Sequence, residues 1–60
     1  MKVLKYYVIR LAERELIYIK DSKGCTLEFD TEAEARKVLI ETEREHPFWF
    51  MGWKKEEIEI

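Results

Sequence analysis

The single histidine, His46, and the single cysteine, Cys25, are the side chains with the most recognisable chemistry. A metal centre normally needs three or four protein ligands, and no Cys or Asp stands at ligand spacing from His46. We therefore expect His46 to be an ordinary residue at the end of a helix. No histidine or base is placed to activate the Cys25 thiol, so we expect a buried, inert cysteine facing the same way as Leu27 and Phe29.

Acidic residues are frequent between positions 32 and 45 and could in principle provide paired carboxylates. Glycosidase-type chemistry needs two carboxylates held at a defined separation in a cleft, which a domain this small rarely has. The spacing of Glu32 and Arg36 instead matches ordinary ion pairing on a helix surface. Gly24 and Gly52 are isolated, so no glycine-rich phosphate-binding loop is present. We predict a non-enzymatic protein without a cofactor or a metal.

Four of the eight aromatic residues fall within His46–Trp53. Tryptophan and tyrosine often dominate protein interfaces because they bury large rigid surfaces at a low entropy cost. If Phe48 and Phe50 enter the core, alternation along an extended chain turns the neighbouring large side chains outward. We therefore predict a partner-binding surface on an uncovered sheet face or rim, formed by Trp49, Met51, Trp53, Tyr6 and Val8. The alternative is that both tryptophans fold over the edge of the helix near Ile40.

A second hypothesis is weak binding of single-stranded nucleic acid. Such binders combine aromatic rings that stack on bases with cations that contact phosphates. The candidate residues are Tyr6, Tyr7, Tyr18, Lys5, Arg10 and Lys20. The net charge is −2, with +3 over residues 1–25 and −5 over residues 26–60. A strong nucleic-acid binder is usually more basic, so protein binding is the preferred hypothesis.

These candidate residues must be positioned by short elements. Residues 2–11 and 15–20 are rich in aromatic and β-branched types, which favours strands, and residues 25–29 alternate clearly. Asp21-Ser22-Lys23-Gly24 is typical of a type I turn followed by a left-handed glycine. The segment 48–60 is expected to contain a last strand, at an edge of the sheet. The order predicts a small α+β domain, β-β-β-α-β, with an antiparallel meander and a helix on one face.

The helix is predicted over residues 31–45. Thr31 and Glu34 form a capping-box sequence, and Pro47 disfavours helical geometry at His46. One stripe at helical spacing should lie on the sheet: Ala35, Val38, Leu39 and Thr42.

The 60 residues are expected to form one domain of marginal stability, for which association is a common remedy. A lone thiol and the lack of an apolar leader predict a cytoplasmic protein, and a bacterial or phage origin would suit it. No apolar run is long enough to cross a bilayer. We therefore expect a small adaptor or inhibitor that binds a protein partner and forms a homodimer, without membrane contact.

Overall fold

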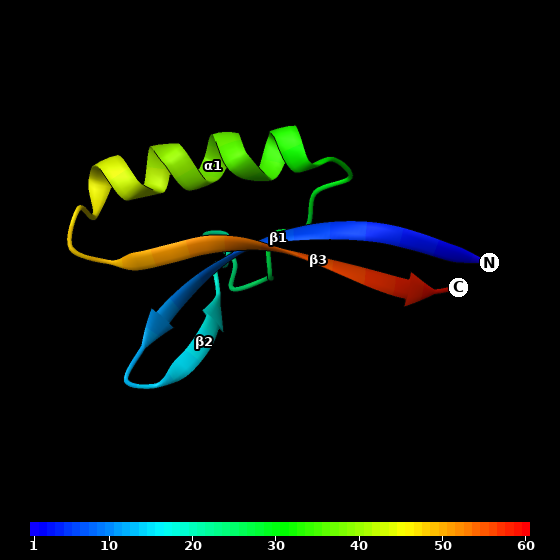
Figure 1. Ribbon diagram of the computed structural model, residues 1–60, viewed down its shortest axis with the longest axis horizontal. Helices are drawn as coiled ribbons and strands as arrows, with labels where there is room; N and C mark the ends of the chain where they lie inside the picture. Colours follow the sequence, from blue (N-terminus) through cyan, green and yellow to red (C-terminus); the bar gives the residue numbers. More distant parts are fainter.

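The computed structural model describes residues 1–60 and confirms a mixed α+β fold. Three antiparallel strands, β1 (Lys2–Ala12), β2 (Glu15–Tyr18) and β3 (Phe50–Glu59), form a sheet in the order β2-β1-β3. The helix α1 (Glu32–Glu45) lies over one face, and the ends of β1 and β3 extend together beyond it (Figure 1). The last strand is therefore at an edge of the sheet, as expected.

The β1–β2 hairpin is closed by a two-residue turn that carries no glycine or asparagine. Ala12 pairs with Glu15, and the intervening Glu13 and Arg14 have φ angles of 49° and 71°. Two consecutive residues with positive φ are the mark of a type I′ turn, whose twist matches that of the flanking strands. The sheet thus imposes a backbone conformation that these two side chains do not favour.

The predicted third strand at 25–29 does not form, so the predicted meander of three consecutive strands is wrong. The segment makes only isolated bridges, Tyr6 with Phe29 and Lys20 with Thr26. The predicted turn before it does form, since Gly24 has a φ of 87° and the Asp21 carboxylate accepts from the backbone N–H groups of Lys23 and Cys25.

Cys25 is exposed, so the expectation of a buried thiol is wrong. The physical reason is that Cys25 belongs to the turn at Asp21, whose carboxylate accepts from the Cys25 backbone N–H, and not to a strand that faces the core.

The helix and its apolar stripe are confirmed. Thr31 is the N-cap, and its hydroxyl accepts a hydrogen bond of 3.3 Å from the backbone N–H of Glu34. Ala35 is fully buried against the sheet, whereas Val38, Leu39 and Thr42 are half-buried. Ile40 is on the outer side of the helix and 52% exposed.

The sheet register decides which side chains share a face. Val8 pairs with Trp53 and Arg10 with Met51, so these four side chains lie on the face that α1 covers. Ile9 pairs with Gly52 on the opposite face. Only three residues are buried in the whole chain, Tyr7, Val8 and Ala35. Val8 and Ala35 therefore form a thin layer between α1 and the sheet, whereas Tyr7 is buried on the opposite face against Tyr18.

The expectation that Phe48 and Phe50 close the core is wrong, since they are 93% and 77% exposed. The backbone N–H of Trp49 donates to the carbonyl of His46 at 3.1 Å, which closes a turn directly after the helix. This turn leaves Phe48 in solvent and carries Trp49 back toward the sheet. Phe50 then enters β3 opposite Leu11, on the face without a helix.

Candidate functional site

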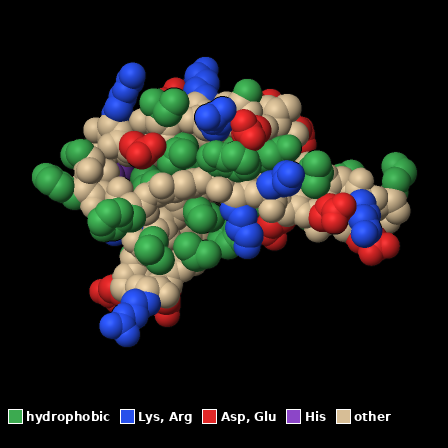
Figure 2. Space-filling model, viewed as in Figure 1, with side chains coloured by type: hydrophobic (Ala, Val, Ile, Leu, Met, Phe, Trp, Pro, Cys, Tyr) green, Lys and Arg blue, Asp and Glu red, His purple; other side chains and the backbone are tan.

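Four exposed or half-exposed apolar side chains meet on the helix-free face of the sheet: Ile9, Leu11, Leu16 and Phe50. We call them the open-face patch. Leu11 pairs with Leu16 of β2 on one side and with Phe50 of β3 on the other, so all three strands contribute to one row. Figure 2 shows hydrophobic side chains gathered around the hairpin and the start of β3. Nothing in the chain covers this patch.

Gly52 leaves a hollow within the open-face patch. No atom lies within 4 Å of the position that a Cβ at Gly52 would occupy. The hollow has a volume of about 260 Å³ and is lined by the patch residues together with Met51 and Gly52. The same surface therefore carries a projecting ring, that of Phe50, and a recess.

Polar groups border the patch along the same face. The hydroxyl of Tyr7 donates to Oε2 of Glu28 at 3.0 Å, and the hydroxyl of Tyr18 donates to Glu56. Burial, followed by the hydrogen bond to Glu28, raises the pKa of Tyr7 from 10.0 to about 12.

Two lysines complete this border. Lys5 pairs with Glu28 and Asp30. Lys54 lies 3.8 Å from Glu56 and donates to the hydroxyl of Tyr18. The hydrogen bond and charges on Tyr18 and Glu56 raise the pKa of Lys54. Both signs of charge therefore stand beside the apolar patch.

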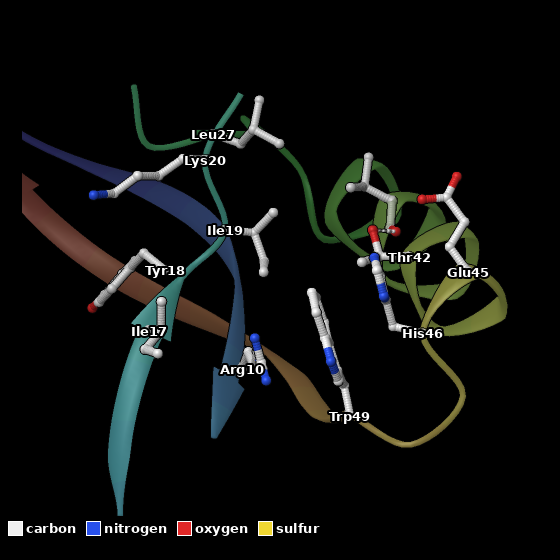
Figure 3. A pocket seen from close by; sticks show the side chains of 11 residues that line it. Arg10, Ile17, Tyr18, Ile19, Lys20, Leu27, Thr42, Glu45, His46 and Trp49 are labelled. Carbon is white, nitrogen blue, oxygen red and sulfur yellow. Dashed lines mark hydrogen bonds between the residues drawn. The ribbon is translucent and has the colours of Figure 1, made fainter. Parts of the chain in front are cut away.

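A second concave surface lies on the helix side of the molecule. It is a groove of about 530 Å³ between the C-terminal half of α1 and β2 with the residues that follow it (Figure 3). Trp49 stands between two other planar groups there. Its ring stacks on His46 at 3.6 Å with an interplanar angle of 3°, and the Arg10 guanidinium lies 3.8 Å from its centroid.

The residues predicted to form an uncovered aromatic face lie on the covered one. Val8 is 1% exposed beneath α1 and has no free surface in the monomer. The rings of Tyr6 and Trp53 contact each other at 6.0 Å, and Trp49 fits against Arg10 and His46. Met51 alone of the predicted set also lines the hollow of the open face. The predicted placement of these residues was wrong because the turn after His46 changes which residues of the following segment face α1. Their roles in binding stay predictions.

The sequence predicted an uncovered sheet face, but the residues of the open-face patch were not the ones assigned to it. Both alternating sets of side chains in β1 are largely apolar, and a single helix covers only one face. The side that the helix would choose could not be told from β1 alone.

The structure also divides the residues proposed for nucleic-acid binding between two faces. Tyr7, Tyr18 and Lys5 lie on the open face beside carboxylates that would repel phosphate. Tyr18 also lines the groove together with Arg10 and Lys20, and Tyr6 lies on the helix side. The six candidates therefore do not share one surface, although Tyr18, Arg10 and Lys20 meet at the groove.

No group of three or more His, Cys, Asp or Glu side chains is arranged to hold a metal ion. The only helix, α1, has 14 residues and is neither long nor apolar enough to span a membrane. No family model, curated protein or solved structure matches this chain.

Proposed function

We propose that this chain is a small non-enzymatic protein–protein interaction module, of adaptor or inhibitor type, that forms a homodimer through the open-face patch. The observation that carries the proposal is the row formed by Leu16, Leu11 and Phe50 across all three strands, with Leu16 56% and Phe50 77% exposed. An exposed apolar row of this kind on a helix-free sheet is typical of a surface that a partner covers.

The accessible surface area of the chain is larger than that expected for a compact monomer, which supports a partner that covers part of it. A compact folded monomer of 7.4 kDa is expected to expose about 4,200 Å². This chain exposes 4964 Å². The excess of about 750 Å² is close to the roughly 800 Å² that one partner contributes to a standard interface.

A second copy fits this surface because projection and recess occur together. In a two-fold dimer, both copies present the same patch, so the Phe50 ring of each can enter the hollow at Gly52 of the other. The bordering Lys54 and Glu56 then provide opposite charges for the rim of the interface. Two sheets packed in this way lie about 10 Å apart.

Sedimentation equilibrium of the wild type, Leu16→Lys and Ile40→Lys tests the dimer. Leu16 and Ile40 are aliphatic and similarly exposed, at 56% and 52%, but only Leu16 belongs to the patch. Leu16→Lys places two lysines in the apolar contact, one from each copy, and should weaken dimerisation at least about 100-fold. Ile40→Lys should leave it unchanged.

Gly52→Val gives a second measurement that leaves the monomer fold intact. A Cβ at Gly52 would meet no atom within 4 Å outside the two neighbouring residues, and the valine side chain would occupy the hollow proposed to receive Phe50. The variant should remain folded and become monomeric. A wild-type chain that sediments as a monomer at about 100 μM, or a dimer that tolerates both patch substitutions, would contradict the proposal.

We further propose that the protein works in a reducing compartment such as the cytoplasm. Cys25 is the only cysteine and its side chain is exposed, so it has no partner for a disulfide within the chain. An exposed lone thiol is most compatible with a compartment that keeps thiols reduced.

A further inference from the structure

The groove on the helix side is separate from the open-face patch and has a different chemistry. Of its eleven lining residues six are hydrophobic, and its walls include Ile17 and Ile19 of the sheet side and Val38 of α1. Its volume of about 530 Å³ falls in the range of small-molecule sites.

Arg10 is one of two cations that line this groove, and its guanidinium has no hydrogen-bond or ion-pair partner. Its Nε is buried without a hydrogen bond, and no carboxylate lies within 4.0 Å of the guanidinium. Buried donors without an acceptor are rare in folded proteins and call for an explanation. The other guanidinium nitrogens also make no hydrogen bond within the chain.

The Arg10 guanidinium is held in place before any ligand arrives. It stacks on Trp49, and Trp49 stacks in turn on His46 at the end of α1. Figure 3 shows Trp49 between the two, with the three groups coming from β1, the segment before β3 and the end of the helix. A cation fixed in this way loses little conformational entropy when it binds an anion.

The other polar groups of the groove do not satisfy Arg10. Glu45 is the only acidic lining residue, and Figure 3 shows its carboxylate pointing away from Arg10. The hydroxyl of Thr42 donates to the carbonyl of Val38 at 2.9 Å. The indole N–H of Trp49 forms no hydrogen bond within the chain and adds a second free donor.

We propose that the groove binds an amphiphilic carboxylate, a small molecule with one carboxylate and an aliphatic body. The planar guanidinium of Arg10 matches the two oxygens of a carboxylate. The aliphatic body lies along Ile17, Ile19 and Val38, where burial of apolar surface favours binding. This site does not depend on the dimer, because none of its lining residues belongs to the open-face patch.

Titration of the ¹⁵N-labelled protein with octanoate, followed by amide and indole chemical shifts, tests the proposal. Octanoate should give saturable shifts of the Trp49 indole N–H and of the amides of Thr42 and Ile19, with a Kd of about 1 mM. Methyl octanoate has the same body without the charge and should bind at least about 10-fold more weakly.

Arg10→Met and Lys20→Met provide matched variants. Both remove one cation from the lining, but the amine of Lys20 points away from the centre of the groove in Figure 3. Arg10→Met should lose at least about 10-fold in octanoate affinity, whereas Lys20→Met should change it less than about two-fold. Arg10→Lys keeps a positive charge and should retain part of the affinity, which gives a second readout if Arg10→Met unfolds.

Three results would overturn the proposal. Octanoate and its methyl ester could bind the groove equally well, which would show that charge is not recognised. The shifts could map only to Leu11, Leu16 and Phe50, which would show binding to the open-face patch instead. Absence of saturable shifts up to about 10 mM octanoate would show that the groove is not a ligand site.

Discussion

At the scale of single residues, Tyr7 connects the packing of the open face to pH. Its ring is buried against Tyr18 in an edge-to-face contact with centroids 5.3 Å apart, and its hydroxyl donates to Glu28. Ionisation of Tyr7 would create a phenolate with little solvent, next to a carboxylate. Burial and this hydrogen bond therefore raise its pKa from 10.0 to about 12.

We predict that Tyr7 makes folding less favourable as the pH rises from 10 to 12. Below pH 10 both the folded and the unfolded chain hold the proton, so the contribution to stability is fully present. Between pH 10 and 12 the unfolded chain releases the proton while the folded chain keeps it, and stability is lost. Across this pH window, the melting temperature of the wild type should fall more steeply than that of Tyr7→Phe. Parallel curves for the two proteins would refute the prediction.

Burial also has to be decided residue by residue. Val8 and Phe50 are both large and apolar, yet Val8 is 1% exposed and Phe50 is 77% exposed. Residue type therefore does not tell which of the two is buried. The side of the sheet on which α1 lies determines this.

At the scale of elements, the β1–β2 hairpin is the part of the chain whose local sequence fits its geometry least. Glu13 and Arg14 both adopt left-handed backbone conformations, which disfavour residues with a Cβ by about 1 kcal/mol or more each. The pairing of Leu11 with Leu16 and of Arg10 with Ile17 fixes the register that demands this turn. Strand pairing therefore overrides turn preference.

We predict that the double substitution Glu13→Asn and Arg14→Gly stabilises the protein by about 1 kcal/mol. Asparagine and glycine accept positive φ, and the larger freedom of glycine in the unfolded chain offsets part of the gain. Urea unfolding at a fixed protein concentration measures the change. The control Glu13→Ala with Arg14→Ala removes the same charges without relieving the backbone and should give no gain; equal stabilisation by both pairs would show that charge is responsible.

At the scale of the whole molecule, this chain is elongated and thinly packed. It extends 39 × 23 × 21 Å, with a radius of gyration of 11.8 Å against about 10.4 Å expected for a compact chain of 60 residues. With three buried residues, the monomer has little core to stabilise it. A partner on the open face would supply the second layer that the sheet lacks.

We predict that the melting temperature of the wild type rises with protein concentration, because dimer formation stabilises the folded state by mass action. A rise from about 5 to about 500 μM protein should increase the melting temperature by several degrees. Leu16→Lys should melt at a temperature that does not depend on concentration, and Ile40→Lys should behave like the wild type. Identical melting temperatures for the wild type at both concentrations would exclude an obligatory dimer.

Elements whose signals are local could be predicted from the sequence. The capping sequence Thr31 to Glu34, the stripe at Ala35 and Val38, and Pro47 together predicted the helix to within one residue. Aromatic and β-branched composition predicted β1, the segment after Pro47 was expected to contain the edge strand β3, and Asp21 with Gly24 predicted the turn between residues 21 and 24. The clear alternation at 25–29, by contrast, did not produce a strand. Hydrogen bonds between near neighbours and side-chain periodicity decide these features, so a single sequence is sufficient for them.

Which face of the sheet remains open depends on contacts between distant parts of the chain. Both faces of β1 are apolar, so its sequence is compatible with a helix on either side. The turn that joins Trp49 to His46 sets the phase of β3 and thereby places Phe50 on the open face and Trp49 beside Arg10. That phase depends on contacts between the end of α1, β1 and β3. Because these contacts join residues far apart in the chain, local patterns indicated an uncovered face but not which residues form the patch or the groove.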